Sequence, residues 1–335
     1  MASPEAERFA EILREAPRMA ELPLADQRAA GEHAEDLTSA PDGIGYEPVH
    51  SRVGPRTPRS RGRGEAAEPA GVDDEHLGEP HPVRGLWATP PAAAPGRALL
   101  YLFGGGHVIT SVHARRKFAG HLALATGVRV LALDYPLAPE HPFPADVRAT
   151  TDGYAWLLEQ GYAADGIALA GESSGGGLVL STLLGIARAG LPRPAAAYLM
   201  SPWADLTCSG ASFDGRAEAD LECSRESLQR MAEQYLAGRD ARDPAASVVF
   251  AGPEELAAAL PPLFVQVGAD EVLLDDSIAV VRSAGIAGVR AALEVWPGMQ
   301  HFFQLGVGVY PEAAEALTGA GAWLADALGV ERPGG

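Results

Sequence analysis

The chain has 335 residues, of which 47% are hydrophobic, and a formal net charge of −18. Its length allows one large α/β domain or two smaller ones, with a sizeable core. The acidic charge argues against nucleic acid or an anionic membrane as the main partner. Two cysteines exclude a disulfide framework, and no apolar run approaches the roughly 20 residues of a membrane helix. Because residues 1–5 also lack the basic and apolar parts of a signal peptide, we expect a cytoplasmic protein.

Two segments precede the regular part of the chain. Residues 1–40 contain amphipathic helical patterns that are too short to form a domain, and we interpret them as a helical cap segment. Residues 41–82 are rich in Pro, Gly and Arg and show little periodicity. This composition predicts an irregular, flexible connection between the cap segment and the domain that follows.

The composition of residues 50–80 allows three interpretations. Residues 51–64 contain five arginines and no acidic residue, although the rest of the chain is strongly acidic. A flexible surface linker is the simplest interpretation, and a basic patch for nucleic acid would need interleaved aromatic residues. Our hypothesis is a local shift of reading frame, because Arg, Pro, Gly and Ala dominate alternate frames of GC-rich DNA. Resequencing of the gene tests it: an intact frame without compensating insertions or deletions would refute the hypothesis.

From Ala98 onward the chain alternates short apolar runs with helical segments. The runs are nearly continuous and rich in Val, Leu and Ile, as expected for strands that are buried on both faces. They cover residues 98–103, 128–133, 167–170, 195–199, 263–267 and 291–296. Strands that alternate with helices predict an α/β fold with a mostly parallel, doubly wound sheet. We assign residues 83–330 to this domain and interpret the polar residues 203–250 as a cap insertion within it.

A serine lies at a sharp turn between the third apolar run and a helical segment. Residues 171–175 read Gly-Glu-Ser-Ser-Gly, directly after the run 167–170 and before the apolar segment 178–184. This arrangement is typical of the nucleophile elbow of α/β-hydrolases, in which glycines leave room for a strained turn that presents the serine hydroxyl. We therefore predict Ser173 as the nucleophile.

A glycine-rich loop follows the first apolar run. Residues 104–106 are three glycines, and a helix is predicted from about Ser111. Ester hydrolysis passes through a tetrahedral oxyanion, which needs backbone N–H donors that already point at it. In the α/β-hydrolase fold this loop and the residue after the nucleophile supply those donors, so we predict Gly104, Gly105 and Ser174. A tight turn or a dinucleotide phosphate loop is the alternative, but no G-x-G-x-x-G pattern is present.

A histidine and a carboxylate follow the last two apolar runs. His301 lies in the loop after the final run, where a triad histidine belongs in the chain order Ser, acid, His. The acid must hold the imidazole in one tautomer and stabilise its charged form. Asp270 and Glu271 both follow the run 263–267. Because adjacent side chains point in different directions, we expect only one of them to reach His301.

Four sequence blocks connect these motifs to a known family. They are residues 103–106 (Phe-Gly-Gly-Gly), 134–145 (Asp-Tyr-Pro-Leu-Ala-Pro-Glu-His-Pro-Phe-Pro-Ala), 171–175 and 201–207 (Ser-Pro-Trp-Ala-Asp-Leu-Thr). The chain resembles the hormone-sensitive-lipase-like carboxylesterases, in particular their bacterial acetyl-esterase and monoterpene-lactone-hydrolase branch, over residues 83–328. In that family the acid stands two residues before a leucine and four before an aspartate. The resemblance therefore implies that Glu271, rather than Asp270, is the acid.

The chain departs from the family pattern near the predicted site. The family block begins His-Gly-Gly-Gly, and Phe103 replaces that histidine. The histidine orients the oxyanion loop, so we expect its loss to loosen the loop and lower the activity. Pro136 replaces a usual arginine, and His107 stands where the family often has an aromatic residue near the pocket mouth.

The predicted activity is hydrolysis of a carboxylic ester or lactone through an acyl-enzyme, with a short-chain or small cyclic substrate. No cofactor is predicted, and no metal site, because no His/Cys cluster with ligand spacing is present. Two alternatives stay open. One is a tailoring enzyme of secondary metabolism that uses the same triad for elimination, cyclisation or acyl transfer, and the other is a non-catalytic binding protein. The sequence carries no signal for the oligomeric state.

Overall fold

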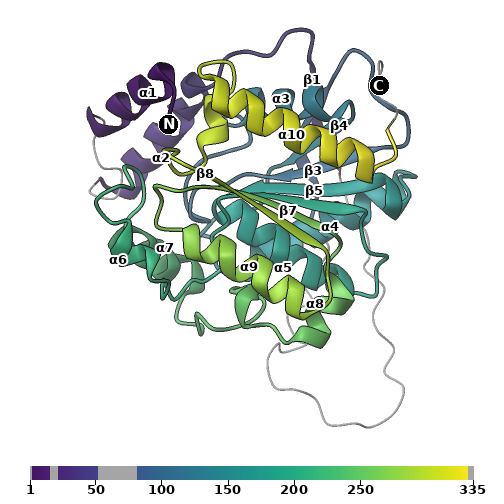
Figure 1. The fold of residues 1–335 in the computed structure, drawn as a ribbon. Helices are drawn as coiled ribbons and strands as arrows, with labels where there is room; N and C mark the ends of the chain where they lie inside the picture. Colours follow the sequence, from purple (N-terminus) through teal and green to yellow (C-terminus); the bar gives the residue numbers. More distant parts are fainter. Residues whose placement is uncertain (1, 16–21, 52–80, 331–335) are drawn as a thin grey trace.

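The computed structural model describes residues 2–15, 22–51 and 81–330 (Figure 1). Most of the arginine-rich segment, for which we gave the reading-frame hypothesis, falls within 52–80 and therefore lies outside the described residues.

An eight-stranded sheet runs through the described part of the chain (Figure 1). Its strands are β1 (Gly45–His50), β2 (Arg84–Thr89), β3 (Ala98–Leu102), β4 (Arg129–Leu133), β5 (Ile167–Glu172), β6 (Ala196–Met200), β7 (Leu263–Gly268) and β8 (Ala291–Trp296). Their order across the sheet is β1-β2-β4-β3-β5-β6-β7-β8. The pairs β1–β2 and β2–β4 are antiparallel, and every other pair is parallel. All six predicted runs form strands, which confirms the mostly parallel α/β sheet.

Helices cover both faces of the sheet (Figure 1). On one face lie α3 (Arg116–Thr126) and α10 (Pro311–Ala327), and on the other lie α4 (Ala145–Glu159), α5 (Ser174–Arg188), α8 (Pro253–Ala259) and α9 (Leu274–Ile286). Short 3-10 helices occur at η2 (His33–Leu37), η4 (Ala164–Gly166), η5 (Val248–Phe250) and η6 (Phe303–Gly306). Because helices pack on both sides, every residue of β3, β5, β6 and β7 is buried. The hydrophobic core therefore surrounds the strands that end at the serine turn and the acid loop.

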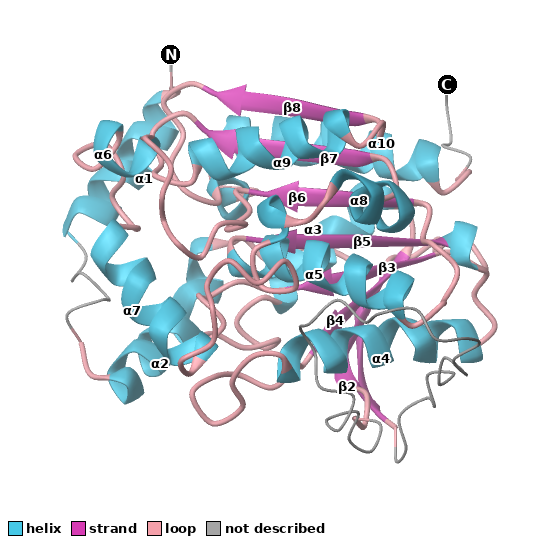
Figure 2. Cartoon of the chain, turned by 90° about the horizontal axis from the view of Figure 1, so that it is seen from below, coloured by secondary structure: helices cyan, strands magenta, loops and turns pink. Residues whose placement is uncertain are grey.

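Four further helices lie together at the carboxyl ends of the parallel strands (Figure 2). They are α1 (Pro4–Glu15), α2 (Leu24–Glu32), α6 (Ser212–Gly215) and α7 (Arg225–Leu236). These helices come from the segments 1–40 and 203–250, which we interpret as the cap. Ligands of open α/β sheets bind outside the carboxyl ends of the strands, so a cap in this position covers the place where a substrate is expected.

One arginine joins the cap to the domain below it. Arg28 on α2 donates from Nε to the carbonyl of Val108 at 3.0 Å and from Nη2 to the carbonyl of Ala138 at 2.9 Å. It also forms a two-pronged ion pair with Glu140, at 2.7 and 2.6 Å. A single guanidinium therefore holds two loops of the domain against α2.

Strand β1 is a correction to the sequence prediction. Residues 41–82 were expected to be irregular, yet Gly45–His50 pairs along its whole length with β2, from Gly45 opposite Thr89 to His50 opposite Arg84. Only Val49 in this strand is buried, and Pro48 occupies one position of it. An edge strand with exposed polar side chains and a proline carries little of the apolar signal by which strands are predicted.

Candidate active site

Ser173 occupies the turn between β5 and α5. Its backbone angles, φ 55° and ψ −127°, are strained for a residue with a side chain. The flanking glycines make the turn possible. A Cβ on Gly171 would lie 2.3 Å from the carbonyl oxygen of Gly175, and a Cβ on Gly175 would lie 2.2 Å from that of Leu102. The elbow is therefore packed against β3 too closely for any side chain at these two positions.

We expect Gly175→Ala to destabilise the fold by about 1–3 kcal/mol, because the added methyl group overlaps backbone atoms that cannot rotate away. The matched control is Gly285→Ala on α9, where nothing lies within 4 Å of the new Cβ. That change should be neutral or stabilise the protein by up to about 1 kcal/mol. Urea unfolding of the three proteins measures both effects, and a Gly175→Ala protein as stable as the wild type would contradict the close packing.

The loop after β3 lies against the elbow. A Cβ on Gly104 would lie 2.8 Å from Cβ of Ser173, and the N–H of His107 donates to Oγ of Ser174 at 3.1 Å. In the part of the chain that the structure describes, the N–H groups of Gly105, Gly106 and Ser174 have no hydrogen-bond acceptor. These three groups are therefore available to bind a negatively charged oxygen beside Ser173.

Gly104 lies against the carboxylate of Glu172, because a Cβ on Gly104 would overlap Oε2 of that side chain. Its N–H makes no hydrogen bond to another described residue, as is the case for Gly105 and Gly106. Gly106, which the sequence analysis left out, has the same unengaged N–H as Gly105. The signal for it was present, because residue 106 belongs to the same run of three glycines.

Phe103 supports the start of this loop by packing. Its side chain is fully buried and stacks on Tyr135 with 4.4 Å between the ring centroids. The Tyr135 hydroxyl donates a hydrogen bond to the Phe103 carbonyl. An apolar stack therefore stands where the family pattern has a histidine. The predicted loss of activity through a loosened loop stays a prediction.

A buried ion pair lies beneath the elbow. Arg115 donates from Nε to Oε1 of Glu172 at 2.8 Å, and the Tyr101 hydroxyl donates to the same oxygen at 3.4 Å. Burial raises the pKa of Glu172, and the guanidinium of Arg115 acts against that rise. Arg115 also lies over the ring of Phe302, the residue after His301. The sequence carries no signal that Glu172 would have this partner, which lies 57 residues away in the chain.

The structure brings Glu271 and His301 together. His301 Nδ1 lies 2.8 Å from Oε2 of Glu271, and both side chains are buried. The other carboxylate oxygen, Oε1, accepts from Oγ of Ser201 at 2.7 Å and from the N–H of Gly268 at 2.6 Å. The neighbouring Asp270 is partly exposed, and among the described residues its side chain makes no hydrogen bond. Of the two adjacent acids, Glu271 is thus the one that hydrogen-bonds to the imidazole ring.

Ser201 was missing from our predicted site residues. Its hydroxyl donates to Glu271 and accepts from the N–H of Phe302 at 3.1 Å, so it connects the loop of the acid with the loop of the histidine. The available signal was its place at the start of the block 201–207, directly after β6.

The Ser173 hydroxyl makes no hydrogen bond to another described residue. Catalytic hydrogen bonds are often long in the absence of substrate and shorten when it binds. Next to His301 lies the thiol of Cys223, whose pKa burial raises to about 11. Cys223 is therefore a neutral thiol at pH 7. The segment that carries it is fixed by Asp220, which accepts from the N–H groups of Cys223 and Val272.

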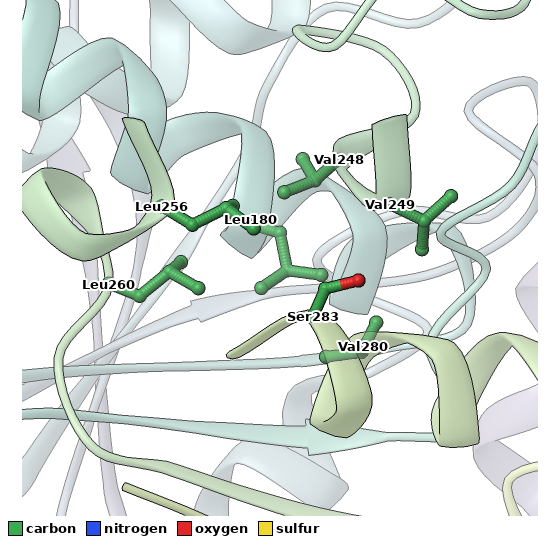
Figure 3. Close-up of a pocket in the computed structure, with 7 residues that line it drawn as sticks. All are labelled: Leu180, Val248, Val249, Leu256, Leu260, Val280 and Ser283. Carbon is green, nitrogen blue, oxygen red and sulfur yellow. The ribbon is translucent and has the colours of Figure 1, made fainter. Parts of the chain in front are cut away.

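Other features lie away from this site. An apolar recess between α5, η5, α8 and α9 (Figure 3) encloses about 10 Å³, which is room for one water molecule at most.

Among the described residues, no three His, Cys, Asp or Glu side chains are grouped as a metal ion would require. None of the described helices is long and apolar enough to span a lipid bilayer.

Comparison with known proteins identifies the family. Residues 99–305 match the family described as alpha/beta hydrolase fold. An acetyl-hydrolase of Streptomyces hygroscopicus is 44% identical over 239 residues, which cover 71% of this chain and 79% of that protein. An esterase of Acinetobacter venetianus is 35% identical over 226 residues, which cover 67% and 73%. The crystal structure of an esterase from the bacterial hormone-sensitive lipase family superposes with a TM-score of 0.83 at 36% identity, over 98% of this chain and 99% of that one. The chain therefore belongs to the hormone-sensitive-lipase-like carboxylesterases of the α/β-hydrolase fold, and it is a carboxylic ester hydrolase.

Proposed function

We propose that the protein hydrolyses esters of short carboxylic acids, or small lactones, through a covalent acyl-enzyme. The observation that carries the proposal is the buried His301–Glu271 hydrogen bond, at the same edge of the sheet as a serine in a strained elbow. A nucleophile, a base and a group that orients the base are the minimum for this chemistry. The similar acetyl-hydrolase supports a small acyl group. The tailoring and binding alternatives gain no support from the similar proteins.

In the proposed reaction Ser173 Oγ attacks the carbonyl carbon of the substrate while His301 Nε2 takes the hydroxyl proton. Glu271 keeps the other ring nitrogen protonated and stabilises the imidazolium that forms. The imidazolium then gives its proton to the leaving alcohol. A water molecule repeats the attack on the acyl-enzyme, with His301 again as the base, and releases the acid.

The oxyanion of each tetrahedral intermediate needs at least two donors. We propose the N–H groups of Gly105 and Ser174, two of the three predicted from the sequence, because neither has an acceptor among the described residues. We add Gly106 for the same reason. Gly104, the third predicted donor, stays in the proposal, since its N–H also has no acceptor among the described residues.

The experiment that tests the proposal combines labelling with a substrate series. A fluorophosphonate should label the wild-type protein, and nitrophenyl esters should be turned over with kcat/KM falling from the acetate and butyrate to the longer chains. A folded wild-type protein that is neither labelled nor active would refute the proposed hydrolase. A flat response to chain length would refute only the short-chain preference.

The pH dependence of the proposed activity follows from the charge on His301. Burial acts to lower its pKa, but the neighbouring Cys223 sulfur and the Glu271 carboxylate at 2.8 Å together raise it above the ordinary value of 6.5. Only the neutral imidazole accepts a proton, so a raised pKa moves the acid limb of the profile to higher pH. We expect kcat/KM for nitrophenyl acetate to rise across neutral pH with its midpoint above 6.5. A midpoint at or below that value would contradict the raised pKa of His301.

A further inference from the structure

A second buried histidine–carboxylate pair lies beside the glycine loop and has no place in the reaction above. Nδ1 of His107 lies 2.8 Å from Oδ2 of Asp146, and their side chains are only 4% and 2% exposed. The two residues are 39 positions apart in the chain and belong to the loop after β3 and the first turn of α4. Burial of a carboxylate is unfavourable unless it is paired, so this contact is a built feature of the fold.

The cap fixes the plane of the His107 ring. Tyr235 of α7 stacks on it with 3.8 Å between the centroids and 9° between the planes. The Tyr235 hydroxyl donates to Oδ1 of Asp146 at 3.0 Å, and the N–H of Val147 donates to the same oxygen at 2.8 Å. When His107 carries its proton on Nδ1, the Asp146 carboxylate accepts three hydrogen bonds, from His107, Tyr235 and the N–H of Val147. In a neutral imidazole this leaves Nε2 with a free lone pair, as an acceptor.

Nε2 of His107 has no partner among the described residues, and it is not sealed inside the protein. In the described part of the chain, four fully buried side-chain atoms have no hydrogen-bond partner. They are Arg115 Nη1, Glu172 Oε2, Trp296 Nε1 and Gln304 Oε1. Because Nε2 of His107 is not one of them and makes no hydrogen bond, the small exposed surface of the ring includes this atom. The ring therefore presents one unpaired polar atom to the space outside it.

The loop that carries His107 adjoins the proposed reaction centre. The backbone N–H of His107 donates to Oγ of Ser174, the residue after the nucleophile. On another side of the ring lies Trp203, at 6.2 Å between centroids, and the N–H of Trp203 donates to the carbonyl of Ser173 at 2.9 Å. His107 is thus joined to the nucleophile turn through two separate contacts.

We propose that His107 Nε2 is a hydrogen-bond acceptor in the wall of the substrate pocket, and that it selects esters carrying a hydroxyl or N–H group near the scissile bond. Asp146 and Tyr235 are positioning residues that hold the ring and its tautomer. This inference rests on the proposed ester hydrolysis and names the substrate class of the same site. A purely apolar ester leaves Nε2 without a partner when it displaces water, and an unpaired buried acceptor weakens binding.

The test compares matched pairs of substrates at pH 8. Nitrophenyl butyrate is paired with nitrophenyl 3-hydroxybutyrate, and ethyl butyrate with 2-hydroxyethyl butyrate, so that the hydroxyl lies on the acyl side or on the alcohol side. The readout is the ratio of kcat/KM for the hydroxylated ester to that for the plain one. We expect at least one ratio to exceed about five in the wild type, and the difference to lie mainly in KM.

Two variants assign the preference to His107. His107→Phe keeps an aromatic ring for Tyr235 to stack on but removes the acceptor, and it should lower the ratio about fivefold, to about one, while plain esters are still turned over. Asp146→Asn keeps the shape of the carboxylate but weakens its hold on Nδ1–H, and it should lower the ratio by a smaller factor. His33→Phe is the control, because the side chain of His33 is 83% exposed on the cap, and its ratio should equal that of the wild type.

The outcomes separate this inference from the proposed function. A wild type that turns over plain esters but prefers neither hydroxylated partner overturns the role of His107 and leaves the hydrolase in place. A ratio within twofold of the wild type in folded His107→Phe overturns it as well. If His107→Phe does not fold, Asp146→Asn decides, and an unchanged ratio in that variant overturns the inference. A wild type without activity on any of the four esters and without fluorophosphonate labelling refutes the proposed function itself.

Discussion

Replacing Ser173 with alanine is expected to lower kcat for nitrophenyl butyrate by about 10⁶-fold and to abolish labelling by a fluorophosphonate. Without Oγ there is no atom to form the acyl-enzyme. The backbone donors of the elbow and the loop can then only stabilise the oxyanion formed by direct attack of water. The variant should fold as the wild type does, because Oγ makes no hydrogen bond to another described residue. Near-ultraviolet circular dichroism and thermal unfolding check that point.

The matched control for this variant is Ser181→Ala. Ser181 lies two turns further along α5 and is also buried, but it is remote from the turn. This protein should keep full labelling and its kcat should stay within about twofold of the wild type. A folded Ser173→Ala protein that retains more than about one per cent of the activity would contradict the assignment of the nucleophile, because the loss of a triad serine is normally far larger.

Replacing Glu271 with glutamine is expected to lower kcat by about 10⁴-fold, whereas Asp270→Asn should leave it within about twofold. The carboxylate of Glu271 accepts from His301, Ser201 and Gly268, and an amide of the same shape can neither accept from all three nor stabilise an imidazolium. The sequence alone left these two adjacent acids open, and the family resemblance favoured Glu271. Kinetics of the two variants with nitrophenyl acetate therefore decide the assignment directly.

The pair of variants also contains its own control. Both changes remove one negative charge from the same loop, so a general effect of charge would appear in both. A large loss in Asp270→Asn with little loss in Glu271→Gln would reverse the assignment. The pH profile gives a second readout, because Glu271→Gln removes the charge that raises the pKa of His301 and should move the acid limb to lower pH.

The sequence predicted those parts of the fold whose structure is indicated by the residues of one short segment alone. The six buried strands are continuous apolar runs, and each strand formed within two residues of its predicted end. Ser173 is marked by its own flanking glycines. The helix expected from about Ser111 begins only at Arg116, because the chain first makes several turns beyond the glycine loop. Edge strand β1 was missed because its side chains face solvent.

The parts that were not predicted depend on partners far apart in the chain. Nothing near Glu172 indicates that Arg115 will pair with it, and nothing near His107 indicates Asp146 or Tyr235. Such networks are set by which loops the sheet order brings together, and β3 lies between β4 and β5 although β4 follows β3 in the chain. A single sequence carries no local trace of those neighbours.

The Arg28 clamp has a consequence for attempts to change specificity by exchanging caps. The guanidinium of Arg28, on α2, donates to the carbonyl of Val108, one residue after His107, and forms an ion pair with Glu140. A cap segment transplanted from a relative would leave the Val108 carbonyl and Glu140 without their cation unless it brought an arginine to this position. In this enzyme α2 and the loop that carries His107 are therefore coupled through one guanidinium, and a chimaera should be cut so that Arg28 and its acceptors stay together.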